Sequence, residues 1–447
     1  MSRCPPLRLA AALALLLGVL PGRSAAWSDH ASLVWPLLRT LPSLNAATLV
    51  VEPLEAFVAR EGAGLASLLE QLEAEARAAS EVYAPRPDAL AFRADGTTLD
   101  GFLAAIRINP DLAYPTYRQV LPGEGDAAAA RERLTFADLS FLPVGSSHTD
   151  VRYLPLVSGE RVTPAQVIAT ASDEPDFGID IGLFEDNGTE AGRRYGYGVQ
   201  PFGNPNLAYS SQAPFHMGFF YLDWLTRAAQ PDLLRTHPAE RVAVFGALAD
   251  FAFATGHDYW GWRFAGWALH YIGDLSQPYH AHPLPGVSTA RALWLVVQGR
   301  SAEAVQLVSN RHGVIESYQH QRLMAALDGD ESAAPLLEAI ASRSAAPWDD
   351  NTLVGRLALE SVAAGTALDE ALEAHVPARY VSDPTFEWTG SGEETRLVPT
   401  LQREGGAATI AALDAILAEQ LERFGRFAHA WILRTSAQAV GPDPGRN

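Results

Sequence analysis

Apolar residues recur at helical spacing along most of the chain. Leucine and alanine alternate with glutamate and arginine in this way over residues 31–80. Thr163 followed by Pro164 predicts a helix over 161–170, because threonine caps a helix and proline fits its first turn. The same periodicity returns over residues 213–275, 287–326, 331–343, 350–374 and 407–436. The pattern predicts an all-α fold.

Proline, glycine and aspartate interrupt the apolar pattern in three places. Residues 84–160 consist of short apolar pieces between turn residues, which is typical of a loop-rich insertion. Residues 171–212 predict a long loop, and 376–400 a shorter one. We therefore expect one helical domain over residues 27–436 with an insertion at 84–160, followed by a flexible tail at 437–447.

The first residues have the pattern of a secretory signal peptide. Arg3 and Arg8 precede an apolar run that ends near Leu20, and Ser24-Ala25-Ala26 supplies small residues for cleavage. The run is shorter than a typical membrane span, and no other apolar run reaches the length of a transmembrane helix. We expect cleavage after Ala26, Trp27 as the new N-terminus, and a secreted or periplasmic protein without a transmembrane segment.

Composition narrows the chemistry that is possible. The chain is 48% hydrophobic and 19% charged, which is typical of a globular protein. Its net charge is −19, and loss of residues 1–26 removes three arginines and no acid, which gives −22. Such an acidic chain is not expected to bind duplex DNA stably, because that requires basic patches. The only cysteine, Cys4, would be removed, so any metal ligands must be His, Asp, Glu or backbone groups.

Ligand-type side chains concentrate in the segment 270–280. His270 and Asp274 are four residues apart, so on a helix they share one face and can reach the same cation. Pro278 ends the helix, and His280 follows it in the turn. The alternative is a buried core histidine paired with an aspartate, with His280 at the surface.

Two further groups of residues have the same character. His312 and Glu316 are again four apart within a segment expected to be helical. The freed α-amine and carbonyl of Trp27 could chelate a metal together with the nearby His30. Each group alone is weak evidence for a metal site, since a histidine and an acid often share the solvated face of a helix.

Together these residues resemble the bacterial zinc-dependent phospholipase C family and the related secreted single-strand-specific zinc nucleases. Residues 270–280 match the family motif His-x-x-x-Asp-x-x-x-Pro-x-His at every fixed position. The pair at 312–316 has the glutamate form found in the phospholipases, and Trp27 stands where the family has an N-terminal zinc ligand. The resemblance implies about three zinc ions per chain, which would hydrolyse phosphate esters through an activated water.

The resemblance also implies a ligand set. The first zinc would be held by Trp27, His30 and Asp274. Asp274 would bridge to the second zinc, which would also be held by His270 and by an earlier aspartate and histidine. The third zinc would be held by His280, His312 and Glu316. We expect Asp173 to be that aspartate, as a zinc ligand and possible general base, with Asp176 and Asp180 as alternatives. We expect His216 to be that histidine, with His237 and His257 as alternatives.

Three functions remain open at this point. A phospholipase C-like hydrolase is favoured by Glu316 and by the cysteine-free mature chain. A single-strand-specific nuclease or 3′-nucleotidase is favoured by the short spacing between Trp27 and His30. A non-catalytic, secreted metal-binding helical protein is the third. The substrate would accordingly be a phospholipid, a single-stranded nucleic acid or a nucleotide. The spacing between Trp27 and Asp173 is longer than in the family. The resemblance therefore says least about the residues that surround the metal site.

Overall fold

A computed structural model describes most of the chain, in the ranges 29–79, 82–124, 133–142, 151–203, 208–287, 298–341, 344–345 and 347–439 together with residue 294. The predicted signal peptide at 1–26, the proposed ligand Trp27 and residues 440–447 of the predicted tail lie outside these ranges. The remaining residues of that tail belong to a helix that continues to Ala439. The predicted all-α fold is confirmed, since helices dominate and the strands are only two or three residues long.

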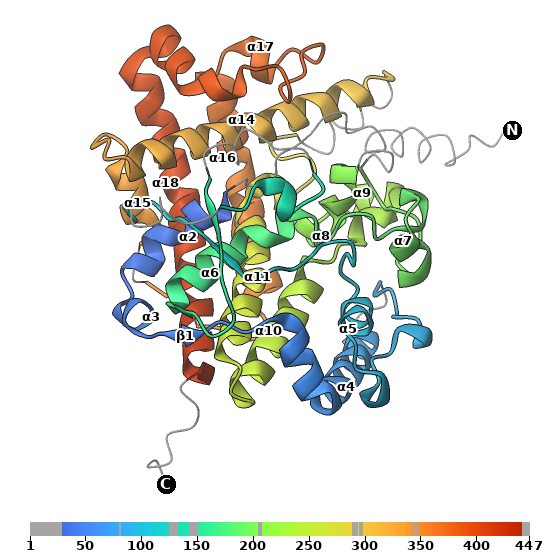
Figure 1. Ribbon diagram of the computed structural model, residues 1–447. Coiled ribbons are helices and arrows are strands. Elements are labelled where there is room, and N and C mark those ends of the chain that lie inside the picture. Colours follow the sequence, from blue (N-terminus) through green and yellow to red (C-terminus); the bar gives the residue numbers. More distant parts are fainter. Residues whose placement is uncertain are drawn as a thin grey trace, which may run out of the picture.

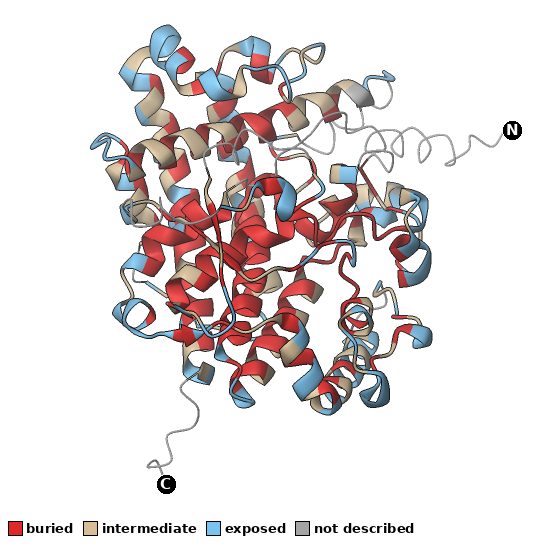
Figure 2. Ribbon diagram, in the orientation of Figure 1, coloured by how far each residue is buried: buried red, intermediate tan, exposed pale blue. Residues whose placement is uncertain are grey.

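The central helix is α11 (Asp258–Ser276). Every residue from Tyr259 to Ser276 is buried, which is the burial expected of a helix surrounded by others. Around it pack α10 (Pro238–Ala254), α6 (Pro164–Asp173) and α18 (Leu397–Ala439), and Figures 1 and 2 show the buried residues concentrated in this middle layer. The aromatic side chains of α11 therefore serve as core.

Two glycines let α11 approach its neighbours closely. A Cβ on Gly266 would lie 2.6 Å from the Cβ of Ala171 in α6. A Cβ on Gly273 would lie 2.9 Å from the Nδ1 atom of His30, which begins α2 (His30–Arg39). Larger side chains at these positions would push α6 and α2 away from the helix that carries His270 and Asp274.

The C-terminal helices form a second group beside this layer. The long helix α14 (Ser301–Leu327) runs across α18 in Figure 1 and contacts both α15 (Ala334–Ile340) and α18. α18 starts before the predicted residue 407, but Gly406 (φ 68°) breaks it into two segments, and the second matches the prediction. The remaining elements of this group are α16 (Leu359–His375), α17 (Ala378–Val381), the π-helical segment η10 (Thr352–Ala358) and η11 (Glu394–Arg396).

Irregular and short elements make up the N-terminal part. Thr163 caps α6 in a capping box with Gln166, as its sequence predicts. The predicted insertion contains η1 (Asp88–Leu90), η2 (Ala94–Gly96), α5 (Leu99–Ala105), β2 (Tyr117–Gln119), η4 (Phe136–Asp138) and β3 (Tyr153–Pro155). β2 pairs antiparallel with β3, and β1 (Leu49–Val50) with β4 (Arg161–Val162). α3 (Pro42–Ala46) and α4 (Leu54–Ala79) complete the segment before it.

The segment predicted as a long loop at 171–212 contains short helices between its irregular stretches. These are η6 (Glu174–Phe177), η7 (Glu185–Asn187), α7 (Glu190–Tyr195) and η8 (Ala208–Gln212). α8 (Ala213–His216), α9 (Trp224–Ala229), η9 (Pro231–Leu234) and α12 (Pro278–Ala281) are equally short. None of the described helices is long and apolar enough to cross a lipid bilayer.

Candidate metal centre

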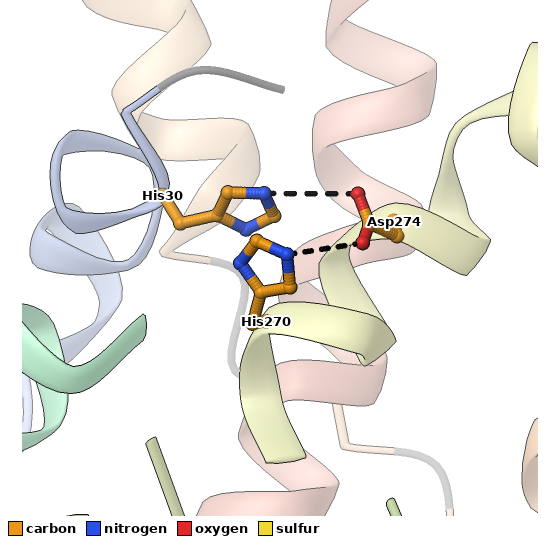
Figure 3. Close-up of side chains that lie close together, drawn as sticks. All are labelled: His30, His270 and Asp274. Atoms are coloured by element: carbon orange, nitrogen blue, oxygen red, sulfur yellow. Dashed lines mark ion pairs between the residues drawn. The ribbon is translucent and has the colours of Figure 1, made fainter. Parts of the chain in front are cut away.

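α11 and the start of α2 bring together the first group of possible metal ligands. His270 and Asp274 lie one turn apart on α11, with 3.2 Å between Nε2 and Oδ2. The other oxygen of Asp274, Oδ1, lies 3.7 Å from Nε2 of His30. Figure 3 shows both imidazoles directed at this one carboxylate from different helices. Asp274 therefore presents one oxygen to each side, as a bridging ligand requires.

A second group lies on the Oδ2 side of Asp274. His216, the last residue of α8, places Nδ1 3.0 Å from Oδ2 of Asp274 and 3.0 Å from Nε2 of His270. Asp176 in η6 places Oδ1 3.7 Å from the His216 Nδ1 atom and 3.9 Å from the His270 Nε2 atom. Asp176, His216 and His270 can thus surround one cation.

The third group joins α12 to α14. Gln277 has extended backbone angles, so α11 ends and Pro278 starts the single turn that carries His280. Nε2 of His280 lies 3.0 Å from Nε2 of His312 and 3.5 Å from Oε1 of Glu316. His312 and Glu316 face each other one turn apart on α14, at 2.7 Å.

The hydrogen bonds of the rings show why a cation fits between them. The Nδ1–H of His270 donates to the carbonyl of Ser172 at 2.8 Å, which leaves a lone pair on Nε2. That lone pair points at Nδ1 of His216, and two lone pairs at 3.0 Å repel unless a proton or metal lies between them. Ligand atoms about 2.1 Å from a tetrahedral zinc are about 3.4 Å apart, close to the separations found in all three groups.

Many polar atoms of the cluster have no hydrogen-bond partner among the described residues. They are both oxygens of Asp274 and of Glu316, both ring nitrogens of His30 and Oδ2 of Asp176. The side chains that carry them are buried. Burying such atoms without partners destabilises a fold, so their concentration in one place fits a metal centre. The residues present can therefore hold metal ions.

The pKa shifts within the cluster also favour a bound cation. Burial opposes charge on Asp274, but the adjacent His270 and His216 outweigh it and hold the pKa of Asp274 well below its usual range. Burial alone would lower the pKa of His216, but Asp274 and Asp180 raise it to about 10. Burial likewise opposes charge on His280, and Asp274 and Glu316 raise its pKa to about 9. The carboxylates thus attract positive charge, and in a metal-free site protons supply it.

One predicted ligand, Asp173, belongs to none of the three groups. Its Oδ1 accepts the backbone N–H of Ala31 at 2.9 Å, and its Oδ2 accepts the side-chain amide of Gln119 at 2.6 Å. Asp173 is the last residue of α6, where Pro175 turns the chain into η6 and directs Asp176 at the histidines instead. The described geometry therefore places Asp176, and not Asp173, beside the histidines, which makes Asp176 the better candidate for the ligand.

A pair of matched substitutions tests this correction. We expect Asp176→Asn to weaken metal binding, because the amide removes a charged ligand atom beside His216 and His270. Asp173→Asn should leave the metal content unchanged and lower the free energy of unfolding by about 1–3 kcal/mol, since it disturbs buried hydrogen bonds. Metal analysis after identical dialysis, combined with urea unfolding, separates the two effects. Metal loss in Asp173→Asn alone would restore the original assignment.

The remaining candidate histidines and Asp180 lie in different surroundings. Of the three candidate histidines, His216 lies in the cluster, whereas Nδ1 of His237 lies 3.1 Å from Glu240 and its ring packs on Phe215. His257, at the opposite end of α11, lies between two glutamates, Glu52 at 2.6 Å and Glu61 at 3.2 Å. Asp180 stands behind His216, with 3.5 Å between Oδ2 and Nε2.

The turn that directs Asp176 is held by an ion pair that the sequence did not reveal. Glu174 accepts Nε of Arg263 at 3.0 Å and Nη2 at 2.6 Å, and the indole N–H of Trp267 also donates to it. Arg263 and Trp267 lie on α11, so this pair fixes η6 against the helix that carries His270 and Asp274. Arginine and tryptophan in an apolar helix give no sequence signal of such a partner.

Seven of the nine predicted ligands lie in the cluster, namely His30, His216, His270, Asp274, His280, His312 and Glu316. Trp27 lies outside the described residues. Comparison of the chain with protein-family models, with curated proteins and with solved structures finds no match.

Proposed function

We propose that the chain is a secreted, zinc-dependent hydrolase of phosphodiester bonds, most similar in its chemistry to a phospholipase C. The observation that carries the proposal is the set of three buried ligand groups, two of which share His270 and lie on either side of the Asp274 carboxylate. Adjacent cation sites bridged by a carboxylate are typical of enzymes that cleave phosphate esters.

The donor set supports zinc as the metal. All the ligand atoms are imidazole nitrogens or carboxylate oxygens, and the three groups provide three ligands each, with some shared. Zinc accepts such ligands in tetrahedral sites, and a catalytic site keeps one position for water or substrate. When bound, zinc would activate water and neutralise the negative charge of a phosphate group.

The residues of the chain would orient the reactants around these ions. Asp176 directs Oδ1 at the histidines, while its Oδ2 is buried with no hydrogen-bond partner among the described residues. Burial raises the pKa of Asp176 to about 6 despite the nearby histidines. Oδ2 is therefore the atom that would accept a proton from an attacking water, and the amide of Gln212, 3.4 Å from Oδ1, helps to orient the carboxylate.

A second function has its own support. The three-residue separation of Trp27 and His30 is closer to that of the single-strand-specific nucleases and 3′-nucleotidases than to that of the phospholipases. Glu316 favours the phospholipase, which is why we place it first. The third candidate is a secreted helical protein that binds metal without catalysis.

A hydrolysis screen separates these functions. The zinc-loaded mature protein is incubated with phosphatidylcholine vesicles, single-stranded DNA and 3′-nucleotides, with the Asp274→Asn variant as control. We expect release of the phosphorylated headgroup from phosphatidylcholine by the unaltered protein only. Cleavage of the DNA or nucleotides instead would identify the nuclease activity. A fully loaded protein that cleaves none of the three would contradict both enzymatic proposals.

A further inference from the structure

The three histidines around Asp274 differ in what their ring nitrogens contact. The Nδ1–H of His270 donates to the carbonyl of Ser172 at 2.8 Å, and Nδ1 of His280 lies 3.2 Å both from the carbonyl oxygen of His216 and from Oδ1 of Asp274. His216 is turned the other way, with Nδ1 toward the cluster and Nε2 3.5 Å from Oδ2 of Asp180. Of these three rings, only His216 has, on the side away from Asp274, a carboxylate that belongs to none of the three ligand groups.

Asp180 is held firmly in that position. It is fully buried, and its Oδ1 accepts Nε of Arg241 at 2.8 Å, with Nη2 at 2.6 Å. Its Oδ2 accepts the hydroxyl of Tyr271 at 2.5 Å. Tyr271 directly follows the ligand His270 on α11, so the same carboxylate connects the helices that carry both histidines.

Arg241 extends this network into the segment predicted as an insertion. Its Nη1 donates to the carbonyl of Ile106 at 3.0 Å and its Nη2 to the carbonyl of Arg107 at 2.9 Å. Arg107 has a positive φ of 52°, a conformation that needs support from surrounding structure. The insertion is therefore joined to the ligand His216 through Arg241 and Asp180.

We propose that Asp180 is a positioning residue of the metal centre, which fixes His216 as the Nε2–H tautomer so that Nδ1 presents its lone pair to the metal. The inference rests on the metal-dependent function proposed above. A carboxylate that accepts the second N–H of a ligand histidine fixes the ring and increases its basicity, and its loss weakens metal binding about 10- to 100-fold. Arg241 holds Asp180 in place and also donates to the carbonyls of Ile106 and Arg107, so the turn at 106–107 helps to support the metal centre.

The chain provides a matched control for this effect. Asp369 accepts the hydroxyl of Tyr279 at 2.7 Å and an N–H of Arg311, so it forms a second buried group of aspartate, arginine and tyrosine. Tyr279 and Arg311 are the sequence neighbours of the ligands His280 and His312. Among the described contacts, however, Asp369 has none with a ring nitrogen of a ligand. If Asp180 only stabilises the fold, its replacement should therefore change zinc affinity about as much as the replacement of Asp369.

The experiment compares Asp180→Asn with Asp369→Asn in the mature protein. Zinc affinity is measured by competition with a chromophoric chelator, and the tautomer of His216 by long-range ¹H–¹⁵N NMR of the zinc-loaded protein. We expect Asp180→Asn to weaken at least one zinc site about 10- to 100-fold, and Asp369→Asn to change affinity less than about threefold. The unaltered protein should show His216 with its proton on Nε2.

Equal zinc affinity in Asp180→Asn and the unaltered protein would overturn the inference. So would a proton on Nδ1 of His216 in the loaded protein, a measurement that requires no variant and holds even if Asp180→Asn does not fold. An unaltered protein that binds no zinc would instead contradict the proposed function itself.

Discussion

Replacement of Asp274 by asparagine is expected to abolish the metal-dependent activity. The two oxygens of Asp274 face different ligand groups, Oδ1 toward His30 and Oδ2 toward His216 and His270. An amide keeps the size of the side chain but replaces one oxygen with a donor and removes the negative charge, so one cation site loses a ligand and the other keeps only a neutral oxygen. We expect phosphodiester hydrolysis to fall by about 10³-fold or more, the equivalent of about 4 kcal/mol in transition-state stabilisation.

Metal content is measured on the same preparations, so that loss of metal and loss of activity can be compared directly. Asp173→Asn serves as the control, because Asp173 is a buried aspartate near the site whose oxygens bond to Ala31 and Gln119. A variant Asp274→Asn that retained its metal ions and turned over at the normal rate would show that Asp274 does not bridge the sites.

Removal of the metal is expected to destabilise the whole fold. The cluster joins α2, η6, α8, α11, α12 and α14, and without a cation its buried carboxylates and imidazoles keep unpaired polar atoms. Metal at 1,000 times its dissociation constant stabilises the folded state by about 4 kcal/mol per site. For several sites this corresponds to a fall in Tm on the order of 10 °C after treatment with a chelator.

The pH dependence of that fall has a defined sign. In the metal-free protein the carboxylates raise the pKa of His216 to about 10 and of His280 to about 9, despite burial. The unfolded chain has ordinary histidine pKa values near 6.5, so this stabilisation is complete below that pH and is lost as the pH rises toward 10. We expect the difference in Tm between the loaded and metal-free protein to increase from pH 6 to pH 9. A difference that stayed below about 2 °C at every pH would contradict the structural importance of the metal.

The parts of the site that the sequence predicted are those set by local geometry. His270 and Asp274, like His312 and Glu316, are one helical turn apart, so the helix alone brings each pair together. The cap of α6 at Thr163 is equally local. These elements require no knowledge of which helices pack against each other.

The parts that it did not predict depend on tertiary contacts. Asp173 and Asp176 are three residues apart across a change from α-helix to 3₁₀-helix, and the turn that directs Asp176 at the histidines is held by a tertiary contact, the ion pair of Glu174 with Arg263. Arg241 lies on a helix with no unusual sequence, yet it joins Asp180 to the backbone of Ile106 and Arg107. The predicted insertion is thus part of the support of the site, which its loop-like composition did not indicate.

The central claim, that this chain holds a cluster of metal ions, is tested most directly by counting the metal. Protein that begins at Trp27, the N-terminus predicted from the sequence, is purified without chelators and without added metal, and its metals are measured by mass spectrometry against protein concentration. We predict two to three zinc ions per chain, since three ligand groups converge around Asp274 and His280. Less than one metal ion of any kind per chain would contradict the account.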